Sequence, residues 1–319
     1  MDRHAARTPD RIALIWAANE PGRYERISYR DLLARVGRMG NLLRSMGVRR
    51  GDRVCLYMPM APDLAVAMLA CARIGAVHSA VFAGFSAESP RDRMVDAGCS
   101  VLITADEGVR GDKVIPLKRI ADAALAGMPE GAGAGAGAGA GIQVLVSRRT
   151  GGDVPMQEGR DRWLDAALAE QRPACPVEWM DAEDPLFLLY TSGSTGRPKG
   201  VLHTTGGYLT YACSTFAAVF DVRDDDIHFC TADIGWITGH SYILYGPLAC
   251  GITSVLGESP PNWPDARRCW QICDDLQATI LYTAPTALRA LMRAGDGPVE
   301  ACSRRSLRLL GTVGEPINP

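Results

Sequence analysis

Long apolar runs are missing from this sequence. Its 319 residues contain no uninterrupted apolar stretch of the roughly 20 residues that a helix needs to cross a bilayer. The N-terminus, which begins Met1-Asp2-Arg3-His4, also lacks the apolar core of a secretory signal peptide. We therefore expect no membrane span and no membrane partner, and we predict a cytoplasmic location.

An excess of charge of one sign is missing as well. Lys and Arg number 34, Asp and Glu number 36, and no basic run stands out. Because nucleic-acid-binding proteins usually carry clustered positive charge, we expect no nucleic-acid partner. With 47% hydrophobic and 22% charged residues, the composition is that of an ordinary globular protein.

Cysteine pairs of the C-x-x-C type are also absent, although the chain has 10 cysteines. The closest two, Cys269 and Cys273, have helical spacing and no histidine nearby in sequence. The five histidines also lack the spacing of metal ligands. We expect reduced thiols in a cytosolic protein and no metal site built from these residues.

Two alternating periodicities predict the fold. Apolar residues at helical spacing predict helices at 32–46, 62–74, 89–97, 266–276 and 285–293. Short apolar runs between turn residues predict strands at 53–58, 77–82, 100–104, 186–190, 227–231, 252–256, 279–283 and 307–313. This alternation indicates α/β architecture with mostly parallel sheets flanked by helices. The exception is 131–141, a strict Gly-Ala alternation without large side chains, which we interpret as a flexible surface insertion.

The segment 191–200, Thr-Ser-Gly-Ser-Thr-Gly-Arg-Pro-Lys-Gly, follows an apolar strand and suits a phosphate. Glycines let the backbone approach a ligand, successive N–H groups form an anion-binding concavity, and the hydroxyls and Lys199 add donors and positive charge. A Walker loop is excluded because Pro198 precedes Lys199 and Gly200 follows it. The loop is not a G-x-G-x-x-G fingerprint either. A phosphate-binding module without catalysis stays open.

This loop resembles the signature of the adenylate-forming superfamily, and further segments resemble the acetyl-CoA synthetases within it. Those segments are 58–62, 70–79, 200–209, 231–242, 245–249, 282–287 and 313–319. The resemblance covers nearly the whole chain except 131–141 and its flanks. It implies that 1–319 is part of the large N-terminal AMP-binding domain.

The resemblance implies a two-step reaction. A carboxylate attacks the α-phosphate of ATP, which gives an acyl-adenylate and pyrophosphate, and the CoA thiol then displaces AMP. ATP, CoA and Mg²⁺ are the implied cofactors, and acetate is the favoured acid, with propionate or another short-chain acid as the alternative. The implied ATP-binding residues are Thr191, Ser192, Gly193, Ser194, Thr195, Gly196, Lys199, Gly314, Glu315 and Pro316.

Two further sites follow from the same resemblance. The implied acyl pocket is walled by Trp236, Ile237, Thr238 and Val313. The implied CoA site consists of Arg110, Gly111, Asp112, Lys113, Thr238 and Asn262. Relatives carry a second arginine where this chain has Lys113. Lysine keeps the charge but loses the bidentate fork for phosphate, so we expect weakened CoA affinity.

The resemblance also implies parts that we do not find in this sequence. Relatives are about twice as long and continue into a hinge and a small C-terminal domain, which carries the adenylation lysine. We therefore assign no catalytic residue. We expect an incomplete chain with poor solubility and little or no ligase activity alone, because strands would be left as unpaired edges. A nucleotide-binding fragment without turnover is the alternative.

Overall fold

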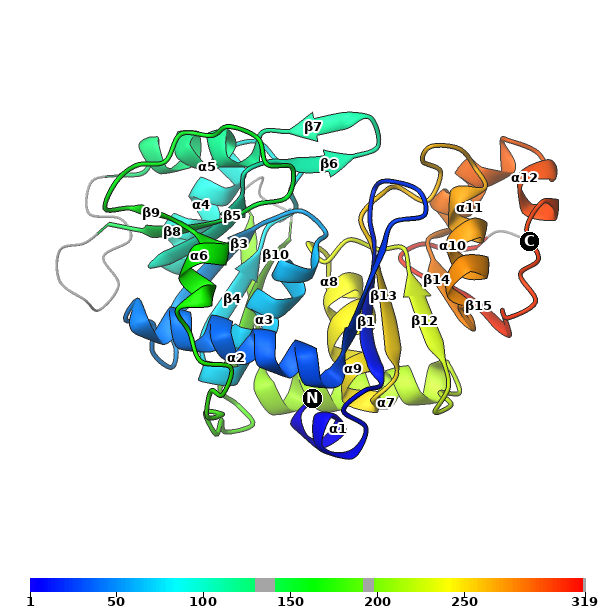
Figure 1. Cartoon of the computed structure of the whole chain (residues 1–319), viewed down its shortest axis with the longest axis horizontal. Helices are drawn as coiled ribbons and strands as arrows, with labels where there is room; N and C mark the ends of the chain where they lie inside the picture. The colour runs from blue at the N-terminus through cyan, green and yellow to red at the C-terminus, as the bar shows by residue number, and fades with distance from the viewer. Residues whose placement is uncertain (130–140, 192–197, 318–319) are drawn as a thin grey trace. The chain divides into compact units, whose positions relative to one another are not determined.

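The computed structural model describes residues 1–129, 141–191 and 198–317 (Figure 1). The chain divides into two compact units. The first comprises Met1–Leu32, Val109–Lys113 and Leu209–Pro319, and the second comprises Leu33–Gly108 and Val114–Tyr208. The Gly-Ala insertion predicted at 131–141 falls, apart from its last glycine, outside the described residues.

The second unit is built on a seven-stranded sheet. In spatial order its strands are β11 (Lys199–Thr204), β10 (Pro185–Thr191), β4 (Val77–Ala80), β3 (Arg53–Tyr57), β5 (Val101–Ala105), β8 (Gln143–Ser147) and β9 (Asp161–Trp163). All neighbouring strands are parallel except β10 and β11, which form an antiparallel hairpin. The helices of this unit are α3 (Pro62–Ile74), α4 (Glu88–Ala97), α5 (Leu117–Ala126) and α6 (Leu164–Ala169).

One buried cluster of the second unit joins helices to its sheet. Met94 of α4 and Leu117 of α5 pack with Leu102 and Val144, which belong to the neighbouring strands β5 and β8. Each of these four side chains is almost fully buried. Burial of apolar surface contributes about 25 cal/mol per Å², so this cluster is a principal source of the unit's stability.

Helix α3 shows why the sequence predicted its limits so well. Pro62 occupies the first turn, where a missing N–H costs nothing, and Gly75 closes the helix in the left-handed conformation at φ 72°. A Cβ at position 75 would also lie 2.8 Å from the sulfur of Met180. Nine residues of the helix are buried, and this explains why its sequence is apolar on nearly every side.

The first unit is built on a six-stranded sheet. In spatial order its strands are β15 (Leu309–Thr312), β14 (Ile280–Thr283), β12 (Ile227–Cys230), β13 (Thr253–Gly257), β1 (Ile12–Ala17) and β2 (Tyr24–Ser28). Every neighbouring pair is parallel except β1 and β2. Its helices include α1 (Asp2–Arg7), α10 (Arg268–Leu276), α11 (Pro285–Met292) and α12 (Gly297–Glu300). Ile272 and Leu276 of α10 pack against Phe229 and Val255 of the sheet.

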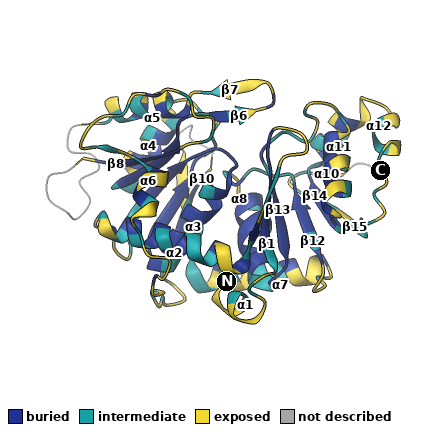
Figure 2. Cartoon of the chain, in the orientation of Figure 1, coloured by how far each residue is buried: buried dark blue, intermediate teal, exposed yellow. Residues whose placement is uncertain are grey.

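Two long helices contain the boundary between the units. These are α2 (Tyr29–Ser45) and α7 (Thr205–Val219). Figure 2 shows that the strands of each sheet are mostly buried, whereas exposed residues gather on loops and on outer helix faces.

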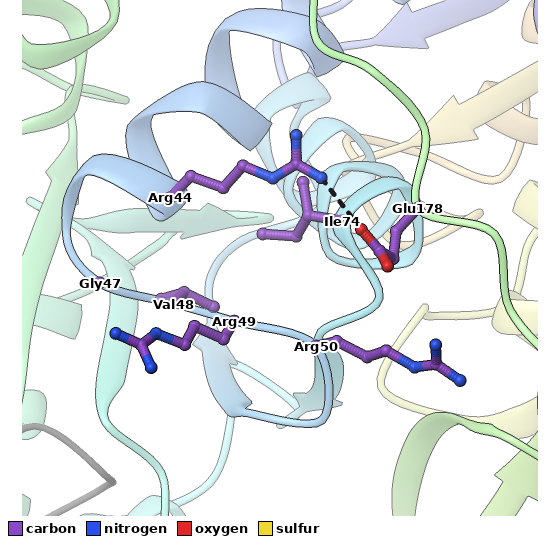
Figure 3. Close-up of a pocket in the computed structure, with 7 residues that line it drawn as sticks. All are labelled: Arg44, Gly47, Val48, Arg49, Arg50, Ile74 and Glu178. Carbon is purple, nitrogen blue, oxygen red and sulfur yellow. Dashed lines mark ion pairs between the residues drawn. The ribbon is translucent and has the colours of Figure 1, made fainter.

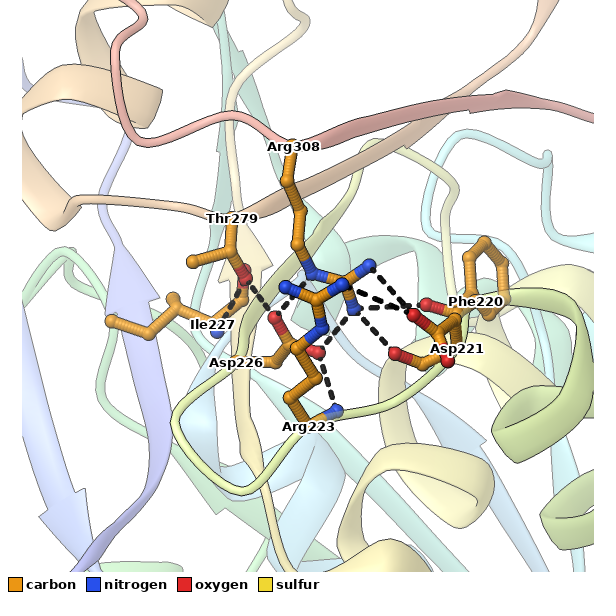
Figure 4. Close-up of polar contacts among 7 residues, drawn as sticks. All are labelled: Phe220, Asp221, Arg223, Asp226, Ile227, Thr279 and Arg308. Atoms are coloured by element: carbon orange, nitrogen blue, oxygen red, sulfur yellow. Dashed lines mark hydrogen bonds and ion pairs between the residues drawn. The ribbon is translucent and has the colours of Figure 1, made fainter.

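A buried ion pair joins the amino ends of three strands in the first unit (Figure 4). Asp226 precedes β12 and is 1% exposed, and its carboxylate accepts from the Arg308 guanidinium at 2.5 and 3.0 Å and from the Thr279 hydroxyl at 2.6 Å. Arg308 precedes β15 and also donates to the carbonyl of Phe220 at 2.9 Å. Burial by itself raises the pKa of Asp226, but the bonds from Arg308 and Thr279 outweigh it and leave that pKa lowered.

The α/β fold and its mostly parallel sheets confirm the architecture predicted from the sequence. All ten cysteines are free thiols, as expected. Strands β1, β2, β8, β9 and β11 were not predicted, nor was the short hairpin of β6 (Gly108–Arg110) and β7 (Lys113–Ile115). Within the described ranges, no helix combines the length and apolar character needed to cross a membrane.

Candidate functional site

The carboxyl edge of the first unit's sheet gathers most of the predicted site segments. Because β15, β14, β12, β13 and β1 run parallel, the chain leaves all five at the same edge. In α/β proteins this edge is where ligands usually bind. The segments that follow these strands include Asn19, 231–238, 258–262 and 313–316.

The turn 110–113 is attached to this edge through its backbone. The Asn19 carboxamide accepts from the Gly111 N–H at 2.8 Å and donates to the Gly111 carbonyl at 2.9 Å. Gly111 is buried and left-handed at φ 67°, whereas Arg110, Asp112 and Lys113 are exposed. The turn therefore has a fixed centre and presents three charged side chains to solvent.

Asn262 precedes Trp263, whose ring lies against the same turn. It is exposed, and the ring of its neighbour Trp263 lies 3.5 Å from the position of a Cβ added at Gly111. Four of the six predicted CoA-site residues are the consecutive residues of this turn, and the fifth, Asn262, is next in sequence to a residue that contacts it. The sixth, Thr238, is half-buried on a separate segment.

That segment begins the predicted acyl wall. Trp236 precedes a continuous irregular helix, formed by α8 (Ile237–Gly239), the π-helical stretch η1 (His240–Tyr245) and α9 (Gly246–Cys250). The side chains of Trp236 and Ile237 are 54% and 40% exposed. A Cβ at Gly239 would lie 2.3 Å from the Asp233 carbonyl, so only glycine fits that position. π-Helical turns occur frequently at functional sites.

Asp233 joins the acyl wall to the turn electrostatically. Burial raises the pKa of Asp233, while a bond from the Gly235 N–H and the charge of Arg110 oppose that rise. Asp233 lies three positions before Trp236, and sequence reasoning did not single it out. The positive charge of Arg110 therefore acts on the Asp233 carboxyl in the loop that follows β12.

The segment 313–316 is fastened to helix α11. Val313 donates its N–H to the Thr283 carbonyl at 3.0 Å, and Gly314 adopts φ 90°. Glu315 accepts from the Thr286 N–H at 2.8 Å, from the Thr286 hydroxyl and from Arg289. The Thr286 hydroxyl bond is the largest cause that lowers the pKa of Glu315. Glu315 therefore joins this segment, which includes the exposed Pro316, to helix α11.

The phosphate loop belongs to the second unit, and five of its predicted residues lie outside the described ones. These are Ser192, Gly193, Ser194, Thr195 and Gly196. Its stem is described: Thr191 ends β10, Lys199 begins β11, and the two residues are cross-strand partners. Both are exposed, so the stem presents a hydroxyl and an ammonium group side by side.

Three residues that sequence reasoning missed or left without a role hold this stem. The Tyr190 hydroxyl donates to the Asp96 carboxylate at 2.6 Å, and the Arg93 guanidinium lies 5.3 Å from the Tyr190 ring centre. Burial and the Asp96 bond raise the pKa of Tyr190. Gly200 packs on the same ring, where a Cβ would come within 3.1 Å. Tyr190, Asp96 and Arg93 also line a cavity of about 440 Å³, together with Pro198.

A second cavity of the same unit, about 460 Å³, is lined by three arginines, two of which are paired with carboxylates (Figure 3). Arg44 pairs with Glu178 at 3.6 Å, and Arg50 pairs with Asp184. Figure 3 shows the guanidinium groups of Arg49 and Arg50 pointing in opposite directions. An anion therefore could not be held by all three at once.

Magnesium does not fit readily on Glu315, because the carboxylate already accepts from Thr286 and Arg289. Among the described residues there is no cluster of three or more His, Cys, Asp or Glu that could hold a metal.

Comparison with known proteins gives a consistent result. The family described as "AMP-binding enzyme" matches residues 1–319. The chain is 58% identical over 319 residues to "Acetyl-coenzyme A synthetase 2" of Pseudomonas aeruginosa, and covers all of itself and 48% of that relative. It is 55% identical over 319 residues to an "Acetyl-coenzyme A synthetase" of Nostoc linckia, of which it covers 92%. The chain thus spans about half the length of the first of these relatives.

Proposed function

Because this chain belongs to the AMP-binding enzymes, and within them to the acetyl-coenzyme A synthetase family, we propose that it forms part of an acetate–CoA ligase. In the first step an acetate oxygen attacks the α-phosphorus of ATP and pyrophosphate leaves. In the second step the CoA sulfur attacks the acetyl carbon, its proton is lost, and AMP leaves. The products are acetyl-CoA, AMP and pyrophosphate.

One observation supports this proposal: segments predicted to face adenine, acid and CoA either follow strands at one sheet edge or are hydrogen-bonded to that edge. These segments are 313–316, 236–238, and the turn 110–113 with Asn262. Holding reactants in one place replaces a bimolecular encounter by an effectively unimolecular step. A shared edge therefore suits successive reactions of one acyl group with two different partners.

The stem of the phosphate loop supplies the charge for the first step. Negative charge builds on the phosphates as pyrophosphate forms, and Lys199 beside Thr191 offers a cation and a hydroxyl donor. Mg²⁺ bound to the nucleotide would neutralise further phosphate charge when present. We also propose a cytoplasmic location, which the ten free thiols support.

The acid is selected by size. Trp236 is a bulky side chain directly before the irregular helix, and its exposed surface can form one wall of an acyl pocket. Such a wall leaves room for acetate and discriminates against longer acids by about 1–3 kcal/mol per methylene. Propionate is therefore the nearest competitor, with larger acids excluded progressively.

Calorimetric titration of the full chain tests the proposal. Non-hydrolysable acyl-adenylate analogues with acetyl and butyryl groups serve as probes. We expect the chain to bind the acetyl analogue at least tenfold more tightly than the butyryl analogue, and Trp236→Ala to reduce that preference to about threefold or less. Trp179→Ala is the matched control, because Trp179 is 85% exposed and belongs to the second unit.

Two results would overturn the proposal. One is no measurable binding of either analogue by the unaltered chain, and the other is an equal loss of preference in both tryptophan variants. Acetate-dependent exchange of pyrophosphate into ATP separates chemistry from binding. Binding without exchange would favour a nucleotide-binding chain that does not turn over by itself.

A further inference from the structure

The end of strand β1 holds a buried amide that the reaction itself does not require. Asn19 is 6% exposed, and both polar atoms of its carboxamide bond the backbone of one residue, Gly111. The two distances, 2.8 and 2.9 Å, are those of good N–H···O bonds. A side chain thus pairs with a peptide much as a neighbouring strand would.

Asn19 is itself held in place by its surroundings. Its own N–H donates to the Glu258 carboxylate at 2.8 Å, and the Glu258 N–H donates to the Ala17 carbonyl at 2.9 Å. Arg268, which is fully buried, donates to the Ala18 carbonyl at 2.7 Å. Three consecutive residues, 17–19, are therefore fixed through their backbone. The carboxamide has little freedom to turn away from Gly111.

The turn is supported from a second direction by Trp263. The indole lies in van der Waals range of the Gly111 Cα region, at 3.5 Å from an added Cβ. Gly111 is buried between this ring and Asn19, whereas its neighbours Arg110, Asp112 and Lys113 are exposed. The support thus acts on the centre of the turn, and the charged side chains on either side remain exposed.

Fixing this backbone matters because of the residue at position 113. Lysine is a flexible point charge and lacks the planar fork with which arginine orients itself on phosphate. A turn that carries Arg110 and Lys113 gains orientation mainly from its own backbone. Each side chain ordered only upon binding costs about 0.5–1.5 kcal/mol of affinity.

We propose that Asn19 is a positioning residue for CoA. By holding the Gly111 peptide on both sides, it presents Arg110 and Lys113 together to the phosphates of the CoA nucleotide. This role rests on the proposed function, since it takes CoA as the ligand of the turn. It concerns CoA alone and leaves the adenine and acyl segments unaffected.

Calorimetry on the full chain with CoA and with AMP tests the role. We expect Asn19→Ala to weaken CoA binding about tenfold, which corresponds to about 1.4 kcal/mol, and to leave AMP binding within twofold. Asn19→Asp keeps an acceptor for the Gly111 N–H but loses the donor to its carbonyl, so its CoA affinity should be intermediate. Arg110→Ala, which removes a charge from the turn itself, should also weaken CoA binding.

Asn41→Ala is the matched control, because Asn41 likewise bonds backbone twice, donating to Arg172 and Ala174 at 2.9 Å each, but in the second unit. It should leave CoA binding unchanged. Hydrogen exchange of residues 108–115 gives a second readout, which should accelerate in Asn19→Ala and stay unchanged in Asn41→Ala.

The outcomes separate the two hypotheses. CoA binding that falls in Arg110→Ala but stays within twofold in Asn19→Ala overturns the positioning role alone. An unaltered chain that binds AMP but not CoA overturns the assignment of this turn to CoA and, with it, the role of Asn19. If Asn19→Ala does not fold, Gly111→Ala perturbs the same peptide through its left-handed backbone, and an unchanged CoA affinity there would refute the role.

Discussion

Replacing Asp226 by asparagine should destabilise the first unit by about 3 kcal/mol. Breaking a buried ion pair by removing one partner costs about 3–5 kcal/mol. The lower value applies because Asp226 is buried but the Arg308 side chain is 20% exposed. Asparagine also turns an amide donor toward the Arg308 guanidinium, which is itself a donor. For a unit of this size the loss corresponds to about 6–12 °C in melting temperature.

The pH dependence of this loss gives a sharper test. The pKa of Asp226 is lowered in the folded state, so its contribution is fully present above the unfolded pKa of about 3.9. It is lost as pH falls through the lower, folded pKa. The difference in unfolding free energy between the parent and Asp226→Asn should therefore be constant from about pH 7 to pH 5. It should shrink below about pH 4.

Urea denaturation followed by circular dichroism measures the loss, and hydrogen exchange of 226–231 and 307–313 localises it. Asp265→Asn is the matched control, since the Asp265–Arg267 pair has a similar distance, 3.0 Å, but both side chains are about half exposed. Exposed pairs contribute about 0–1 kcal/mol. The reasoning fails if the two variants lose equal stability, or if Asp226→Asn with Arg308→Met is as unstable as the sum of the single changes.

The remaining predictions concern one helix end and one loop stem. Gly75→Ala should cost at least about 1–2 kcal/mol in urea denaturation, because Gly75 is left-handed and its Cβ would meet Met180; a neutral result would contradict the observed packing. Tyr190→Phe should weaken ATP binding about fivefold in calorimetry and leave CoA binding unchanged, since the Asp96 bond that holds the loop stem contributes about 1 kcal/mol. Unchanged ATP affinity would show that the stem does not need this bond.

Elements with local signals could be predicted from the sequence. The limits of α3 match the expectation at both ends, because Pro62 and Gly75 act through their own backbone conformations. Strand β9 was missed because it has only three residues and is defined by pairing with β8. Strand β8 has five residues, as many as the predicted β3, and its limits depend on pairing with β5. The π-helical stretch η1 was also missed, because a π-helical turn has no residue pattern that distinguishes it from an ordinary helix.

The candidate site divides in the same way. Arg110, Trp236 and Glu315 were predicted as site residues because each sits in a short continuous motif. Asn19 could not be predicted, since its partner Gly111 is 92 positions away and the positioning role proposed for it depends on a contact that only the folded chain creates. Tyr190 and Asp96, 94 positions apart, were missed as a pair for the same reason.

The parallel pairing of β1 with β13 affects how the chain folds during its synthesis. The Thr253 hydroxyl donates to the Ile12 carbonyl, 241 positions earlier, and β1 is almost entirely apolar and buried. A ribosome that adds about 5–20 residues per second needs roughly 10–50 s to make the intervening chain. During that interval β1 has only the β2 hairpin on one side, and its other edge awaits a partner. The growing chain therefore carries an apolar strand with one unpaired edge through most of its synthesis. A chaperone that binds extended apolar segments would bind this strand.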